Sequence, residues 1–208
     1  MDTYITDFCM IAGQVLFMEL VEYKKKMWYL LEVKTIAGED EMTVLTCLVP
    51  EELYKGLHFR KGSWVFVTGS LRDTVAYPRG GEGCWIEVKQ IAHLKEERLK
   101  GYYNSATFVC WFPEETNFQV CLSQDHFLWQ RLYAETVRPD ADALMGLYCL
   151  VPREIPVNGP NDDDFVQITG ALVMDETWSS GIYVLVERID KPEDIEKAVP
   201  FLAGYEDE

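Results

Sequence analysis

Large aromatic and basic side chains alternate with aliphatic ones in three stretches of the sequence. Successive side chains of a strand point to opposite faces, so this alternation sets rings and cations on one face and an aliphatic core on the other. Such rings can stack on flat groups, and the lysines among them can pair with anions. The residues concerned are Trp28 and Lys34 in the stretch 27–35, Trp64 and Phe66 in 63–71, and Trp85 and Lys89 in 84–91.

Further cations stand in segments whose composition indicates turns and loops. Lys24, Lys25 and Lys26 follow one another directly before the first of these stretches. The glycine-rich stretch 76–83, "AYPRGGEG", carries Tyr77 and Arg79 and is typical of a hairpin loop. These residues extend the candidate binding surface beyond the strands.

No catalytic, metal or cofactor site is expected. The three histidines are isolated in sequence, and no hydrolase or metalloprotease motif is present. The six cysteines lie among apolar residues without the close spacing of zinc ligands, so we expect reduced, buried thiols. The run Asp162 to Asp164 is expected to be solvated and to discourage pairing at a strand edge, rather than to bind a cation.

The patterning of residues 1–100 predicts five strands and one short helix, which would position the candidate binding residues. Strands are expected at about 8–20, 27–35, 42–49, 63–71 and 84–91. Between the third and fourth strands, "PEELYKGL" begins with Pro50 and two glutamates, as the first turn of a helix often does.

The same pattern recurs about 101 residues later. "CLVP" at 47–50 matches "CLVP" at 149–152, and "TGSL" at 68–71 matches "TGAL" at 169–172. Trp28, Thr35 and Cys9 have identical residues at an offset of 101. The small changes in offset fall in expected loops, where insertions cost least. The sequence therefore predicts two diverged copies of one unit.

A five-stranded order with a helix between strands three and four is that of the OB-fold, a Greek-key barrel. "LHFRKGSWVFVTGSLRD" (57–73) resembles the region around the fourth strand in bacterial single-stranded DNA-binding (SSB) proteins, and "IAGQVL" (11–16) resembles their first strand. The resemblance covers about residues 5–95, and more faintly 104–190. We expect an all-β chain with two tandem OB-fold barrels, each with that helix.

The resemblance implies a non-enzymatic protein that binds single-stranded DNA, in replication, recombination or a mobile element. It places the strand-contacting residues on strands two to five and the hairpin loop, and it adds Arg72 as a phosphate contact. RNA in place of DNA, a homodimer and replication-protein partners remain open. Alternatively, Trp64 and Phe66 form an apolar interface instead of binding DNA, and Lys24 to Lys26 lie in a solvated loop without a binding role.

The distribution of charge separates the two copies. Residues 1–100 hold 13 Lys+Arg and 15 Asp+Glu, whereas residues 101–208 hold 6 and 20, out of a net charge of −16. A polyanion is therefore expected to bind the first copy rather than the second. The main alternative is a protein-interaction module, acidic enough to mimic DNA, that binds no nucleic acid. A barrel for a small ligand or oligosaccharide is a third possibility.

The expected organisation is an OB domain at 1–100, an acidic OB domain at 101–192 and an acidic tail at 193–208. The tail carries Phe201 and Tyr205, which are hypothetical partner-docking residues because acidic tails of SSB proteins dock partners. No apolar run is long enough to span a bilayer and no secretory signal is apparent, so a cytoplasmic protein without membrane partners is expected.

Overall fold

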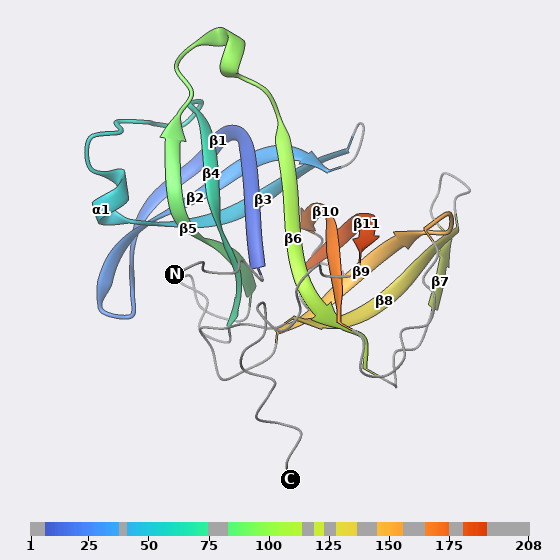
Figure 1. Cartoon of the computed structure of the whole chain (residues 1–208). Coiled ribbons are helices and arrows are strands. Elements are labelled where there is room, and N and C mark those ends of the chain that lie inside the picture. The colour runs from blue at the N-terminus through green and yellow to red at the C-terminus, as the bar shows by residue number, and fades with distance from the viewer. Residues whose placement is uncertain are drawn as a thin grey trace. The chain divides into compact units, whose positions relative to one another are not determined.

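Strands make up most of the chain in the computed structural model (Figure 1). The structure describes residues 7–37, 41–74, 83–113, 119–122, 128–136, 145–155, 165–174 and 181–190. Helical structure in these ranges is confined to α1 (Glu51–Tyr54) and the 3-10 turn η1 (Glu97–Leu99). The expected all-β class is confirmed for the described residues. None of the helices in these ranges has the length and apolarity needed to cross a bilayer.

The chain divides into two compact units, and neither is a single continuous segment. One consists of Phe8–Ala106 with Ala171–Tyr183, and the other of Met1–Asp7, Thr107–Gly170 and Val184–Glu208. The predicted domain boundaries at 100 and 192 stay a prediction.

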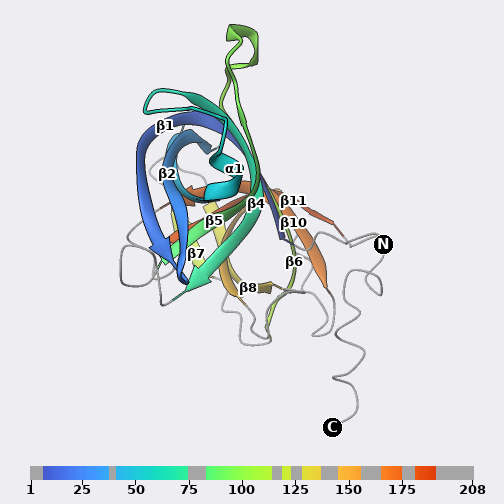
Figure 2. The same cartoon turned by 90° about the vertical axis from the view of Figure 1, so that its left-hand side faces the viewer.

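The first five strands form a closed barrel, called here the N-terminal barrel. Their order is β2-β3-β5-β4-β1, and a further antiparallel pairing of β1 with β2 closes the ring. All neighbours pair antiparallel except β3 and β5, which are parallel. Figure 2 looks along this barrel, with its strands curving around α1. The strands are β1 (Asp7–Tyr23), β2 (Lys26–Ala37), β3 (Glu41–Pro50), β4 (Trp64–Thr74) and β5 (Gly83–His93).

The barrel interior is filled by the mainly apolar residues that alternation assigns to it. Leu31, Val33 and Thr35 of β2 are fully buried, and so are Leu45 and Cys47 of the neighbouring β3. The inward-facing residues of the other strands are buried in the same way. The period-two pattern therefore predicted the core face correctly.

The second set of strands repeats the order of the first. It runs β6-β10-β11-β9-β8-β7, with a further β6–β8 pairing that closes a ring of five. Taking β6, β8, β9, β10 and β11 as counterparts of β1 to β5 gives the same neighbours throughout, and β7 is an addition. The strands are β6 (Tyr103–Trp111), β7 (Gln119–Leu122), β8 (Leu128–Thr136), β9 (Met145–Pro152), β10 (Val166–Met174) and β11 (Ile182–Asp190).

Strand register agrees with the repeat at single-residue level. Trp28 lies opposite Pro50 in the first unit, and Trp129 lies opposite Pro152 in the second. The repeated "CLVP" therefore occupies the same place on the third strand of each ring. A shared register supports the duplication, which itself stays a proposal.

The repeated glycine of "TGSL" and "TGAL" has a steric cause. A Cβ on Gly69 would collide with the carbonyl oxygen of Glu87, and a Cβ on Gly170 would collide with that of Leu185. Only glycine allows the two backbones to approach this closely. In β4, Gly69 lies at an irregularity in the pairing with β5.

The helix between the third and fourth strands is present as α1 in the N-terminal barrel. Its Tyr54 stacks on Tyr29 with ring centroids 3.8 Å apart and makes an edge contact with buried Phe59 at 4.9 Å. The Tyr54 hydroxyl donates a hydrogen bond to the Phe59 carbonyl. Burial, and secondly the neighbouring Tyr29, raise the pKa of Tyr54. After β9, the described residues 153–155 form a turn, so a second helix is not found among them.

The cysteines with described side chains are buried thiols of the core. They are Cys9, Cys47, Cys84, Cys110 and Cys149. Burial raises the pKa of the Cys47 and Cys149 thiols to about 12. Burial, and secondly Cys149, also raise the pKa of Cys110 well above its usual range. Thiols in this environment stay protonated and act as small apolar residues.

Candidate nucleic-acid interface

The predicted lysine cluster lies at the tight turn that joins β1 to β2. Tyr23 pairs with Lys26, so Lys24 and Lys25 form a two-residue turn, and all three lysines are exposed. Lys24 and Lys25 adopt φ values of 49° and 61°. A two-residue turn with both φ positive normally takes Asn-Gly, because other residues are strained in this region. The strain is roughly 1–2 kcal/mol for each residue.

An aromatic cluster lies immediately beside this turn on the outer face of the barrel. The Tyr23 ring contacts Trp28 edge-on at a centroid distance of 6.2 Å and Trp85 at 5.5 Å. The Trp28 indole N–H donates a hydrogen bond to the Tyr23 carbonyl, 3.1 Å away. The cluster is built on Leu30 and Leu48, which point outward but are fully buried beneath it. The Lys24 ammonium lies 5.2 Å from the centroid of the Tyr23 ring.

The outward exposure predicted for Trp85 is wrong. Its ring is on the expected face of β5 but is only 3% exposed, because Tyr23 and Leu48 pack against it. Trp28 is half-buried and keeps part of its ring accessible. Of these two tryptophans, only Trp28 can therefore present a surface to a ligand without rearrangement.

The two strand lysines lie on separate strands of the barrel. Lys34 is half-buried on β2, opposite Val44 of β3, and Lys89 is exposed on β5. Acidic residues share this region: Glu19 pairs with Leu30, and Glu32 pairs with Phe17, which is 38% exposed. The face is therefore mixed in charge away from the lysine turn.

Trp64 and Phe66 lie on β4, which pairs with β1 and β5 rather than with β2 or β3. Both are half-buried. The Trp64 ring packs on Tyr102 at a centroid distance of 4.8 Å. This contact lies within the chain, so part of the Trp64 ring is used in packing. The structure does not bring this pair to the cluster of Tyr23 and Trp28.

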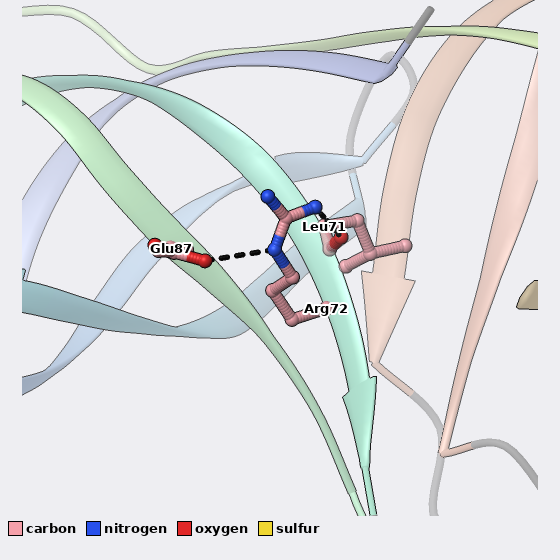
Figure 3. Close-up of polar contacts among 3 residues, drawn as sticks. All are labelled: Leu71, Arg72 and Glu87. Atoms are coloured by element: carbon pink, nitrogen blue, oxygen red, sulfur yellow. Dashed lines mark hydrogen bonds and ion pairs between the residues drawn. The ribbon is translucent and has the colours of Figure 1, made fainter. Parts of the chain in front are cut away.

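Arg72 forms an ion pair across the β4–β5 hairpin. Its Nε lies 2.8 Å from Oε2 of Glu87, and its Nη1 donates to the Leu71 carbonyl at 3.2 Å (Figure 3). The Arg72 side chain is 14% exposed. A phosphate would have to compete with Glu87 for the Arg72 guanidinium. The predicted phosphate contact of Arg72 therefore stays a prediction, and the ion pair with Glu87 argues against it.

Some predicted residues lie outside the described ranges. They are Tyr77 and Arg79 of the β4–β5 loop, and Phe201 and Tyr205 of the tail. Within the described ranges, no three His, Cys, Asp or Glu side chains gather into a group that could hold a metal ion.

The residue that sequence reasoning missed is Tyr23. It precedes the lysines and was not singled out, although its ring joins Trp28 to Trp85. A two-residue turn centred on Lys24 and Lys25 would have placed it opposite Lys26 and beside Trp28. The sequence did not indicate this two-residue turn, because the turn lacks the Asn-Gly composition that is typical of such hairpins.

Comparison with known proteins gives similarity of fold. No protein-family model matches the sequence, and no curated protein matches it. Among solved structures, the wild-type single-stranded DNA binding protein from Thermus aquaticus is similar with a TM-score of 0.65 at 15% identity, over 89% of this chain and 92% of that one. A deletion mutant of that protein gives 0.62 at 13%, over 89% and 94%. At such identities the likeness establishes the fold alone, which is an OB-fold similar to that of these structures.

Proposed function

We infer that this protein binds single-stranded DNA through the outer face of the N-terminal barrel next to the β1–β2 turn. The observation that carries this inference is the strained lysine turn. Lys24 and Lys25 occupy left-handed positions that a better turn former would fill at lower cost. Strain of this kind is kept where a site needs the side chains.

The position of the turn fits the way OB-folds bind oligonucleotides. These barrels bind with the face of strands two and three and with the loops that follow strands one and four. Here that region joins three exposed lysines to the rings of Tyr23 and Trp28. Bases stacked on such rings gain about 1–3 kcal/mol each, while lysines pair with phosphates. The likeness to the Thermus structures supports the same reading.

A second candidate function, a protein-interaction module without DNA binding, is favoured by two observations. Trp85 is buried rather than available for stacking, and the Arg72 charge is paired with Glu87. Fewer groups than the sequence predicts are therefore available to a DNA strand. The two functions differ in whether the lysine turn contributes to binding.

The test is a titration of the intrinsic tryptophan fluorescence with dT oligonucleotides of about 30 residues at several salt concentrations, for the wild type and the variant Lys24→Asn/Lys25→Gly. Glycine relieves the strain at position 25 but adds conformational entropy to the unfolded chain, and asparagine keeps part of the strain at position 24, so the variant is expected to be more stable by about 1–2 kcal/mol rather than by the sum of both strains. It should nevertheless bind more weakly. Its slope of log affinity against log salt should be shallower by about 1.4, which corresponds to two lost phosphate contacts.

A matched control removes the same charge elsewhere. Lys55→Asn/Lys61→Asn alters two exposed lysines at α1 and the loop after it, and should leave the salt slope close to that of the wild type. Absence of quenching by dT in the wild type, even at low salt, would rule out the proposed function. Equal weakening in both double variants would mean that only net charge matters and that the turn is no specific site.

A further inference from the structure

A second aromatic surface lies on the strands β8 and β9, in the other compact unit. Tyr133 of β8 lies opposite Tyr148 of β9, and their rings meet edge-on at a centroid distance of 5.4 Å. A Cβ added to Gly146 would collide with the ring and hydroxyl of Tyr133. The Tyr133 side chain therefore reaches over the glycine, and both tyrosines are half-buried.

The ring of Tyr148 already receives a cation. The guanidinium carbon of Arg131 lies 4.3 Å from the centroid of this ring. The face of an aromatic ring carries negative charge density, and a guanidinium over it is stabilised by about 0.5–1 kcal/mol at an exposed site. The Arg131 contact places a guanidinium of the chain itself on one ring of this surface.

Strand register adds two tryptophans to the same face. Residues that pair directly across strands share a face, as do residues two apart along a strand. Trp129 is two residues from Arg131 on β8, and Trp111 of β6 pairs with Glu135. Both tryptophans are half-buried. We call the set Trp111, Trp129, Arg131, Tyr133 and Tyr148 the tyrosine face.

The charge of this region selects the class of ligand. Residues 101–208 hold 20 Asp+Glu against 6 Lys+Arg. Arg131 is the one base within the tyrosine face, whereas the β1–β2 turn presents three exposed lysines. A phosphate backbone needs cations along its path, so the acidic unit disfavours nucleic acid. Positively charged ligands are attracted to it instead.

We propose that the tyrosine face docks an extended, arginine-containing segment of a partner protein, with its cations over Tyr133 and Tyr148. Side chains two residues apart in an extended segment lie about 6–7 Å from each other, and the centroids of the Tyr133 and Tyr148 rings are 5.4 Å apart, so alternate arginines can reach both rings. Aromatic-lined grooves recognise proline-rich peptides in this way. This interaction lies beyond the proposed DNA binding, because it uses other strands and a ligand of opposite charge.

The experiment uses the full chain and a fluorescein-labelled decapeptide of alternating arginine and proline, followed by fluorescence anisotropy. A decapeptide of alternating glutamate and proline is the control ligand and should not bind. Tyr133→Leu and Tyr148→Leu remove a ring but keep the net charge of the protein. Each should weaken binding about two- to fivefold, the effect of one exposed cation–π contact. Tyr133→Phe and Tyr148→Phe keep the ring and should retain binding.

Two further variants make the result decisive. Tyr103→Leu removes an exposed tyrosine outside the face and should leave peptide affinity unchanged. Arg131→Gln removes the internal cation that competes for Tyr148, so it should tighten peptide binding about two- to fivefold. A gain in affinity cannot result from misfolding.

Three outcomes would overturn the proposal. These are failure of the arginine–proline peptide to bind the wild type, unchanged affinity in both Tyr→Leu variants, and weaker peptide binding in Arg131→Gln. Loss of dT binding in Tyr133→Leu and Tyr148→Leu, without peptide binding, would assign the face to nucleic acid instead. Binding of dT by the wild type tests the other surface separately, so the two proposals can fail independently.

Discussion

At the scale of single residues, Gly69 and Gly170 show that a short sequence motif can result from close contact between two backbones. Each stands where the carbonyl oxygen of the neighbouring strand leaves no room for a Cβ. The repeated Thr-Gly-small-Leu pattern is therefore explained by strand packing, and no ligand is needed to account for it. The sequence comparison found the motif, but only the structure gives its cause.

Substitution of Gly69 by alanine tests this explanation. The added Cβ must push β4 away from β5, and overpacking of this kind costs about 1–3 kcal/mol in the free energy of unfolding. Gly101→Ala is the control, because nothing lies within 4 Å of a Cβ placed there. Urea denaturation measures both. A loss below about 0.5 kcal/mol for Gly69→Ala, the usual range of surface changes, would show that the strands separate without cost.

The expected exposure of Trp85 was wrong, and the ion pair of Arg72 was not anticipated, for reasons that sequence patterns do not contain. Alternation placed Trp85 on the correct face, but it could not show that Tyr23 would cover it. The Arg72–Glu87 pair depends on the register of a hairpin with a long loop and an irregularity next to Gly69. Periodicity gives the face of a residue, while the neighbours across strands come from register.

At the scale of elements, the strands and their order were predictable from the sequence. Period-two patterning located the five strands of the N-terminal barrel, and the repeat extended them to β6, β8, β9, β10 and β11 but not to β7. The helix after Pro50 followed from its proline and glutamates. The tyrosine face was not predicted, because Arg131, Tyr133 and Tyr148 are unremarkable until β8 and β9 pair. The distribution of charge had predicted only that a polyanion binds the first copy rather than the second.

Asn104 of β6 joins strands that are far apart in the sequence within one compact unit. Its side-chain N–H groups donate to the carbonyls of Ile36 and Leu172 at 2.8 and 2.7 Å, and its oxygen accepts from the Leu172 N–H at 3.1 Å. The neighbouring Tyr103 carbonyl accepts a hydrogen bond from Thr35. These bonds connect β6 with β2 and β10.

Asn104→Ala is expected to lower the free energy of unfolding by about 2–4 kcal/mol, because each buried polar group left without a partner costs about 1–3 kcal/mol. Gln90→Ala, at an exposed position of β5, should change it by less than about 0.5 kcal/mol. Chemical denaturation followed by circular dichroism compares the two. Equal stability of both variants would mean that water replaces the Asn104 side chain without loss.

At the scale of the whole molecule, buried thiols in both units couple stability to alkaline pH. Cys47 and Cys149 have folded-state pKa values of about 12, raised by burial from 9.0. Between these values the unfolded chain loses thiol protons that the folded chain keeps. The stabilisation is therefore complete below about pH 9 and falls as the pH rises toward 12, by about 1.4 kcal/mol per pH unit for each thiol.

The measurement is urea denaturation at several pH values between about 8 and 10.5, where this difference in proton binding develops. The variant Cys47→Ala/Cys149→Ala should be less stable at pH 8 but should lose stability less steeply above pH 9. The two proteins share every other titratable residue, so the difference between the two curves isolates the thiols. Parallel curves would contradict the assigned pKa values.

The edge-on contacts of Tyr23 with Trp28 and Trp85 also give the molecule an optical property. Rings held in a fixed asymmetric arrangement produce near-ultraviolet circular dichroism, which disappears when side-chain packing is lost even if the backbone keeps its structure. Because these rings adjoin the lysine turn, they add to the spectrum a signal from the candidate interface. The protein thus carries an intrinsic chromophore at the position where a label would otherwise be attached.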